Sequence, residues 1–104
     1  MDTAPLLVVV NPAAGGGRAL RRWPRHARAL SRAGVAHHVV WTRAAGDATA
    51  EVARAWAAGT HRFIAVGGDG TVNEVLNGLA AALEDPQSPR PWLAVLAAGT
   101  GNDW

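Results

Sequence analysis

The sequence contains no cysteine and no lysine among its 104 residues. Without cysteine the chain can form neither disulfides nor thiolate metal sites, and this fits a cytoplasmic location. Without lysine the phosphate-binding loop GxxxxGK[ST] is excluded. All ten basic residues are therefore arginine, whose charge does not titrate, and the formal net charge is only +2.

Long apolar runs are also missing. No run reaches the roughly 18–20 residues that a membrane-spanning helix needs. The four histidines include no pair at i,i+4 spacing, and the adjacent His37 and His38 would point to opposite faces of a strand. We therefore expect no membrane span and no histidine metal site. With 49% hydrophobic residues, the chain should form one small domain or part of one.

The sequence does contain an alternation of short apolar runs and helical patterns. Strands are predicted at residues 6–10, 35–42, 62–66 and 92–97. Helices are predicted at about 20–32, 47–58 and 71–83. Asp47 should be the N-cap of the second helix, and Pro24 should either kink the first helix or mark its first turn. The third helix should bury a stripe formed by Val72, Val75, Leu76, Leu79 and Leu83. This order predicts an α/β fold, a parallel sheet with helices on both faces and right-handed crossovers.

Three of the predicted strand ends carry glycine-rich loops of the same character. They are NPAAGGGR at 11–18, GGDGTVNE at 67–74 and AGTGND at 98–103. Because ligands bind beyond the carboxyl ends of parallel strands, the three loops should share one rim. Glycines let a ligand approach the backbone, and N–H groups at a helix start favour phosphate. One such loop could be a flexible connector, whereas three on one rim predict a polyphosphate site.

Asp69 is the residue in these loops that phosphate binding does not explain. A carboxylate repels phosphate, so Asp69 should either hold Mg²⁺, directly or through water, or accept a proton from an attacking hydroxyl. The structural alternative is an Asx-turn. Thr71 and Glu74 have the T-x-x-E spacing of a capping box, which would account for both without a ligand.

Arginines are concentrated in the first predicted helix. They are Arg18, Arg21, Arg22, Arg25, Arg28 and Arg32, and they follow roughly one face. This face is either simply solvated or a contact surface for anionic phospholipid or nucleic acid.

Four ordered motifs closely resemble the catalytic domain of the diacylglycerol kinase family. They are NPAAGGG (11–17), TRAAGDA (42–48), GGDGTVNEVLNG (67–78) and GTGND (99–103). That family includes bacterial lipid kinases and sphingosine and ceramide kinases, and its superfamily includes NAD kinases and phosphofructokinases. The resemblance implies the three-layer α/β nucleotide-binding domain of that superfamily, with a parallel sheet.

The resemblance also implies a function. It implies that ATP is bound with Mg²⁺ and that its γ-phosphoryl group passes to a lipid hydroxyl such as that of diacylglycerol. Asp69 is the implied catalytic residue, and no metal ligand is assigned. The implied ATP-binding residues are Asn11, Thr42, Gly67, Gly68, Asp69, Gly70, Thr71, Val72, Asn73, Glu74 and Thr100. The alternatives are an NAD kinase-like enzyme, which shares the GGDG turn, and a non-catalytic module that binds a nucleotide or an anionic surface.

Members of this family continue into a β-rich domain that supplies part of the lipid site, further metal ligands and, in bacterial members, a glutamate general base. We therefore expect residues 1–104 to be the N-terminal nucleotide-binding part of a longer lipid kinase. Alone, they are not expected to form a competent enzyme. The expected partners are a nucleotide and a lipid substrate at a membrane surface, without nucleic acid and with self-association left open. The expected location is the cytoplasm, including the membrane periphery.

Overall fold

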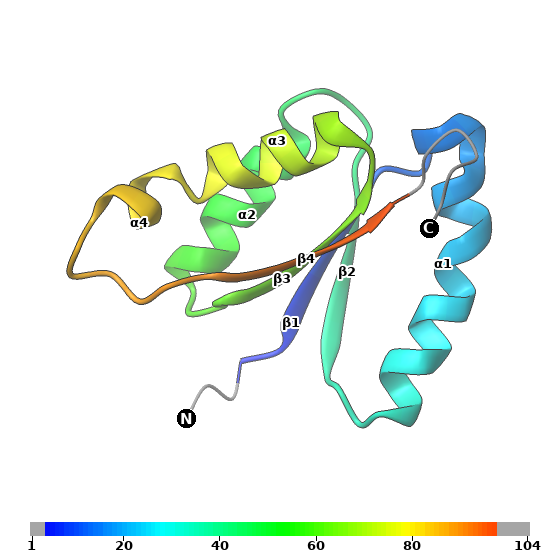
Figure 1. Ribbon diagram of the computed structural model, residues 1–104, viewed down its shortest axis with the longest axis horizontal. Coiled ribbons are helices and arrows are strands. Elements are labelled where there is room, and N and C mark those ends of the chain that lie inside the picture. The colour runs from blue at the N-terminus through cyan, green and yellow to red at the C-terminus, as the bar shows by residue number, and fades with distance from the viewer. Residues whose placement is uncertain (1–3, 98–104) are drawn as a thin grey trace.

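The protein is described by a computed structural model over residues 4–97. Its strands are β1 (Leu6–Val10), β2 (His37–Trp41), β3 (Arg62–Gly67) and β4 (Trp92–Ala97). They form a parallel sheet in the order β2-β1-β3-β4. The helices are α1 (Ala14–Arg32), α2 (Asp47–Ala57), α3 (Asp69–Gly78) and α4 (Ala80–Glu84) (Figure 1). The predicted α/β fold with a parallel sheet is confirmed.

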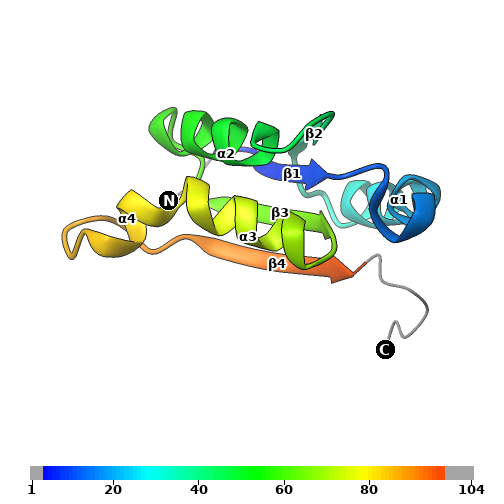
Figure 2. The same cartoon turned by 90° about the horizontal axis from the view of Figure 1, so that it is seen from above.

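Helices cover both faces of the sheet. On one face α1 packs through Ala19 and Trp23. On the other face α2 and α3 lie side by side and pack through Val52 and Val75 (Figure 2). Alternate residues of β1 contribute to these two cores, so all five residues of the strand are buried. This explains why β1 is a continuous apolar run and not an alternating one.

The strand order creates a crevice at one end of the sheet. From β1 the chain moves toward β2, whereas from β3 it moves to β4 on the other side. The carboxyl ends of β1 and β3 therefore flank a topological switch point, where the connecting loops diverge. A hydrogen bond of 3.0 Å from the Asn11 N–H to the Val66 carbonyl joins the two strand ends. The fold thus directs the loops that follow β1 and β3 around one crevice.

The first helix begins earlier than predicted, at Ala14. Gly15, Gly16 and Gly17 have φ angles of 64°, 67° and 95°, so the chain makes a left-handed turn before the regular helix. Side chains rarely adopt this region, which accounts for the glycines. Pro24 lies inside α1 and not in its first turn. No helix within residues 4–97 is long and apolar enough to cross a bilayer.

The third predicted helix is divided in two. It begins at Asp69, before the predicted start at 71, and it ends as α3 at Gly78, with α4 following after Leu79. Val75 and Leu79 are buried as predicted, but Leu76 is 42% exposed. The break accounts only for the end of the predicted stripe, because residues beyond Leu79 no longer continue the face that packs on the sheet. Leu83, in α4, is likewise 43% exposed.

Candidate functional site

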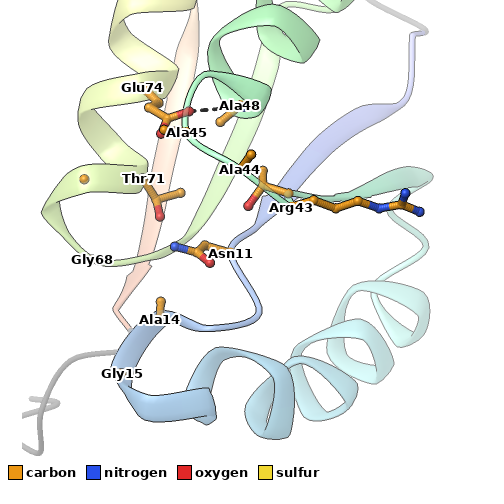
Figure 3. Close-up of a pocket in the computed structure, with 12 residues that line it drawn as sticks. Asn11, Ala14, Gly15, Arg43, Ala44, Ala45, Ala48, Gly68, Thr71 and Glu74 are labelled. Atoms are coloured by element: carbon orange, nitrogen blue, oxygen red, sulfur yellow. Dashed lines mark hydrogen bonds between the residues drawn. The ribbon is translucent and has the colours of Figure 1, made fainter.

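A pocket of about 480 Å³ occupies the crevice at the switch point. Its walls come from the ends of β1, β2 and β3 and from the beginnings of the helices that follow them (Figure 3). Six of the predicted site residues line it, namely Asn11, Thr42, Gly68, Gly70, Thr71 and Glu74. The structure therefore brings residues from three separate strand ends to one pocket.

Backbone pairing holds Asn11 and Thr42 at the pocket. The Asn11 side-chain oxygen accepts a hydrogen bond from the Ala13 N–H at 3.1 Å, and this bond orders the turn after β1. In Figure 3 the Asn11 side chain points toward Thr71. The Thr42 N–H donates to the Val10 carbonyl at 2.9 Å, and its hydroxyl approaches the same oxygen at 3.4 Å. Thr42 thus continues the pairing of β1 with β2 and lies beside the end of β1.

The two glycines at the end of β3 have different roles. A Cβ on Gly67 would overlap the Thr71 side chain, whose Cβ would lie only 2.8 Å away. Gly67 therefore allows the first turn of α3, with its buried Thr71, to pack closely on the end of β3. Gly68 and Gly70 differ, because a Cβ on either would meet no atom within 4 Å. Neither has a positive φ, so the backbone does not require glycine there, and both face the pocket.

The start of α3 forms part of the pocket wall through Gly68, Gly70 and Thr71. Gly68 is its N-cap, and no side chain within residues 4–97 caps the helix. The first N–H groups of a helix have no acceptor within the helix, and the helix dipole adds a partial positive charge. An open pocket bordered by such groups suits an anion, and phosphate in particular.

Glu74 does not form the predicted capping box. Its Oε1 instead accepts hydrogen bonds from the Gly46 N–H at 3.0 Å and the Ala48 N–H at 3.2 Å. The Glu74 main-chain carbonyl accepts a further bond from the Thr49 hydroxyl at 2.8 Å. The capping-box prediction is wrong because the carboxylate caps the start of α2, a neighbouring helix, and not its own.

Asp47 fixes the other end of the same loop. Its carboxylate accepts hydrogen bonds from the Arg43 N–H at 2.8 Å and the Ala44 N–H at 2.9 Å. These two bonds lower the pKa of Asp47 below its ordinary value. The N-cap of α2 is Gly46, with a φ of 91°, so the prediction that Asp47 is the N-cap is wrong. Asp47 turns back to the loop before the helix instead.

Several predicted residues lie outside the pocket lining. Asp69 is exposed at the start of α3, and within residues 4–97 its carboxylate makes no hydrogen bond or ion pair. The lining includes the glycines on either side of Asp69 but not Asp69 itself, and it also omits Gly67, Val72 and Asn73. Thr100 lies outside the described residues.

The site also contains residues that motif reasoning did not select. They are Ala14, Gly15, Arg43, Ala44, Ala45 and Ala48. Their position just after strand ends could have identified them, and alanine, like glycine, leaves room for a ligand. The side chain of Arg43 extends away from Asn11 and Thr71 in Figure 3.

Comparison with known proteins identifies the family. The sequence pattern of the diacylglycerol kinase catalytic domain matches residues 5–104. The chain belongs to the diacylglycerol kinase catalytic domain family. A diacylglycerol kinase from Staphylococcus aureus is 40% identical over 97 residues, which are 93% of this chain and 29% of that protein. A diacylglycerol kinase from Staphylococcus saprophyticus is 39% identical over 97 residues, which are 93% of this chain and 30% of that protein.

Solved structures agree with this assignment. A crystal structure of a diacylglycerol kinase from Bacillus anthracis matches with 37% sequence identity and a TM-score of 0.66. The match covers 95% of this chain and 34% of the B. anthracis chain. The expected three-layer, NAD kinase-like fold is therefore confirmed. The resemblance to the diacylglycerol kinases, from which that fold was expected, is confirmed as well. The chain spans about 29% of the length of the curated S. aureus relative.

The residues of this diacylglycerol kinase family member fit Mg²⁺ only together with a phosphate ligand. Among the described residues, no three histidine, aspartate or glutamate side chains are grouped to hold a metal. Glu74 is engaged by two N–H groups, whereas the exposed Asp69 carboxylate is available. Mg²⁺ is commonly held by one or two carboxylates together with substrate phosphates and water. One carboxylate beside a phosphate-compatible pocket matches that pattern.

Proposed function

We propose that this chain is the ATP-binding portion of a Mg²⁺-dependent lipid kinase, which transfers the γ-phosphoryl group of ATP to a lipid hydroxyl such as that of diacylglycerol. Membership of the diacylglycerol kinase family gives the enzyme class. One observation supports the nucleotide assignment above all others. The pocket at the switch point is bordered by the uncapped start of α3 and by two glycines that the fold itself does not require.

In this proposal the triphosphate of ATP lies against the start of α3. The N–H groups of its first turn and the open sides of Gly68 and Gly70 receive the phosphate oxygens. Asn11 and Thr42 contact the nucleotide from the ends of β1 and β2, and Thr100 contacts it from the segment after β4. Gly67, Val72 and Asn73 act through the backbone and packing of the β3–α3 turn.

The reaction is an in-line phosphoryl transfer. The lipid hydroxyl oxygen forms a bond to the γ-phosphorus while the bond from that phosphorus to the β–γ bridging oxygen breaks, and ADP leaves. The hydroxyl proton passes to a carboxylate. Bound Mg²⁺ neutralises charge on the phosphates. Asp69 is the carboxylate of this chain that we place at the reaction, either beside the metal or as the proton acceptor.

Residues 1–104 would then be the nucleotide-binding part of a larger catalytic unit. The curated relatives are more than three times as long as the matched region, so there is room for a separate acceptor site. The names of these relatives favour a lipid acceptor over NAD. If the complete gene product phosphorylated NAD but not diacylglycerol, the assignment of the acceptor would be wrong.

Calorimetric titration of the chain with MgATP tests the nucleotide site. We expect saturable binding that weakens severalfold when Mg²⁺ is omitted or Asp69 is replaced in Asp69→Ala. Glu84→Ala is the matched control, because it removes an exposed carboxylate at the end of α4, far along the chain from the pocket. The control should bind MgATP as the unchanged chain does.

The outcomes separate two parts of the proposal. Binding that is equal in the Asp69→Ala and Glu84→Ala variants would retain the nucleotide site but remove Asp69 from it. No binding by a chain whose circular dichroism spectrum shows folded α/β structure would contradict the assignment of the pocket to ATP.

A further inference from the structure

The pocket assigned to ATP has one basic side chain among the described residues that line it. Arg43 and Glu74 are the charged residues of this lining, and the Glu74 carboxylate is engaged by two N–H groups of the β2–α2 loop. A triphosphate is strongly anionic, and bound Mg²⁺ neutralises only part of its charge. The sequence contains no lysine that could supply a further cation. Arg43 is therefore the side chain of this lining that can meet the remaining negative charge.

Arg43 borders two cavities. It belongs to the loop that forms one wall of the ATP pocket, but its side chain extends away from Asn11 and Thr71 (Figure 3). It also lines a second cavity of about 290 Å³, between the end of β2 and the first turns of α2. We call this second space the outer cavity. Trp41 and Arg54 line the outer cavity and not the ATP pocket. Arg43 is thus placed where its side chain can lie on either side of the loop.

Among the described residues, none holds the Arg43 guanidinium group in the outer cavity. The Asp47 carboxylate accepts its hydrogen bonds from the main-chain N–H groups of Arg43 and Ala44. The Glu51 carboxylate is paired with Arg54 at 2.7 Å. The exposed Arg43 side chain makes no hydrogen bond or ion pair in the described part of the chain. Its charge contributes less to the lowered pKa of Asp47 than the two backbone bonds do. The guanidinium group can therefore leave the outer cavity without breaking a bond.

We propose that Arg43 turns into the ATP pocket when the nucleotide binds and donates hydrogen bonds to its phosphate oxygens. The proposal rests on the proposed function, since it is ATP that brings phosphate into the pocket. Rotation between staggered side-chain conformations moves the guanidinium group while the main chain stays in place. The planar group donates two parallel hydrogen bonds to a phosphate, and such charge-assisted pairs are among the strong hydrogen bonds of proteins. The main-chain bond from Arg43 to Asp47 is kept in both positions.

Contact with phosphate explains a movement of Arg43 better than contact with the adenine base does. A ligand shifts a side chain only to the extent that it favours one position over the other. An adenine ring would offer an aromatic face, and the outer cavity already offers one at Trp41. A phosphate offers negative charge and paired acceptors. The outer cavity offers neither freely, because its carboxylates are engaged and it contains the like charge of Arg54.

Calorimetric titration of the variant Arg43→Gln with MgATP tests this proposal. The matched control is Arg54→Gln, which removes the same charge from the outer cavity but not from the ATP pocket. Arg54 is paired with Glu51 in an exposed ion pair, so its loss should cost little stability. A further variant, Arg43→Lys, retains the positive charge without the planar fork. Magnesium tripolyphosphate and adenosine are titrated as well, because the first contains only the phosphates and the second only the nucleoside.

We expect Arg43→Gln to weaken MgATP binding about tenfold, which corresponds to the loss of a hydrogen bond to a charged group. Magnesium tripolyphosphate should lose a similar factor, whereas adenosine should bind the variant and the unchanged chain alike. Arg43→Lys should recover part of the loss, and Arg54→Gln should bind MgATP as the unchanged chain does. The substitution leaves the Arg43 main-chain N–H for Asp47, so the urea unfolding midpoint should not change. The loss of binding then cannot be attributed to unfolding.

Equal affinity of Arg43→Gln and Arg54→Gln for MgATP would overturn the proposal. So would a loss of affinity for MgATP and adenosine with tripolyphosphate unaffected, because Arg43 would then contact the base. In both cases the unchanged chain still binds MgATP, so the proposed function would stand. If the unchanged chain, shown to be folded, bound no MgATP, the assignment of the pocket to ATP would fail, and the role of Arg43 would fail with it.

Discussion

Glu74 connects two loops that are far apart in the sequence. It lies in α3, yet its carboxylate caps the start of α2 across a separation of 28 residues to Gly46. The segment it holds, from Arg43 to Ala48, forms one wall of the pocket. At the scale of the single residue, Glu74 therefore positions the wall. A direct contact with ATP is not needed to explain why a glutamate stands here.

Replacing Glu74 should separate positioning from charge. Because Oε1 accepts both bonds, the amide oxygen of Glu74→Gln can take its place, whereas Glu74→Ala leaves both N–H groups without an acceptor. We expect Glu74→Ala to lower the free energy of unfolding by about 1–3 kcal/mol and to weaken MgATP binding. Glu74→Gln should keep most of the stability and most of the affinity for MgATP. Urea denaturation measures the first and calorimetry the second. A glutamine variant as defective as the alanine variant would show that the negative charge itself is required.

Asp47 makes stability depend on acid pH. Its folded-state pKa is lowered by the N–H groups of Arg43 and Ala44, so its contribution is present above the ordinary value of 3.8. The contribution disappears as the pH falls through the lowered pKa and the carboxylate is protonated in both states. We expect Asp47→Asn to be less stable than the unchanged chain at about pH 6 and equally stable well below about pH 4. Urea unfolding midpoints of the two proteins across this pH range measure the difference. A difference in midpoint that did not change with pH would contradict the role assigned to the Asp47 carboxylate.

At the scale of single residues, the sequence predicted the pocket better than it predicted the bonds within it. Asn11 and Gly68 were predictable, because residues just beyond parallel strands meet at one rim. Thr42 was expected only from the family resemblance, since the apolar pattern placed it inside the strand predicted at 35–42. The partners of Glu74 and Asp47 were not, because local spacing favours a cap on the residue's own helix. The structure satisfies these carboxylates with donors of the β2–α2 loop, which only the packing of α2 against α3 brings close.

Helix α3 is held against α2 by a close contact at its last residue. A Cβ on Gly78 would lie 2.7 Å from the Thr49 carbonyl oxygen and 2.9 Å from the Val52 Cβ. Both distances are too short for real atoms, so the two helices can approach only because Gly78 has no side chain. At the scale of elements, this contact sets the distance between the helices whose first turns border the pocket.

Two glycine-to-alanine substitutions in the same helix should have opposite effects. Gly78→Ala forces a methyl group into α2 and should lower the free energy of unfolding by about 1–3 kcal/mol. Gly70→Ala meets no atom within 4 Å and should be neutral, or stabilising by up to about 1 kcal/mol, since alanine is the better helix former. Thermal and urea denaturation of both variants measure this. If Gly78→Ala were as stable as Gly70→Ala, the helices would have room to separate.

The order and type of the elements followed from the sequence, but some boundaries did not. Apolar runs identified all four strands, because a parallel sheet buried on both faces needs them. The division of α3 from α4 was missed, since the apolar spacing of Leu76, Leu79 and Leu83 continues through the break. Periodicity indicates which residues could share a face of a helix, but it does not indicate where the helix is interrupted.

At the scale of the whole molecule, the sheet has an unpaired edge at β4. This strand pairs with β3 on one side, and no other described strand lies on its far side. Its side chains Trp92 and Val95 are 53% and 49% exposed. An exposed apolar edge strand offers backbone groups and side chains to another chain. The 104-residue chain should therefore self-associate as its concentration rises.

The variant Val95→Lys should reduce this association, because a charge on an edge strand opposes pairing with a second edge. Leu76→Lys is the matched control, since Leu76 is exposed to a similar degree, 42%, but lies on α3 and not on the edge strand. Sedimentation velocity over a range of concentrations should show more monomer for Val95→Lys and unchanged association for Leu76→Lys. If both variants shifted the equilibrium equally, apolar exposure in general would drive association. If neither did, the edge of β4 would not be the contact, and the opposite edge at β2 would be the next to test.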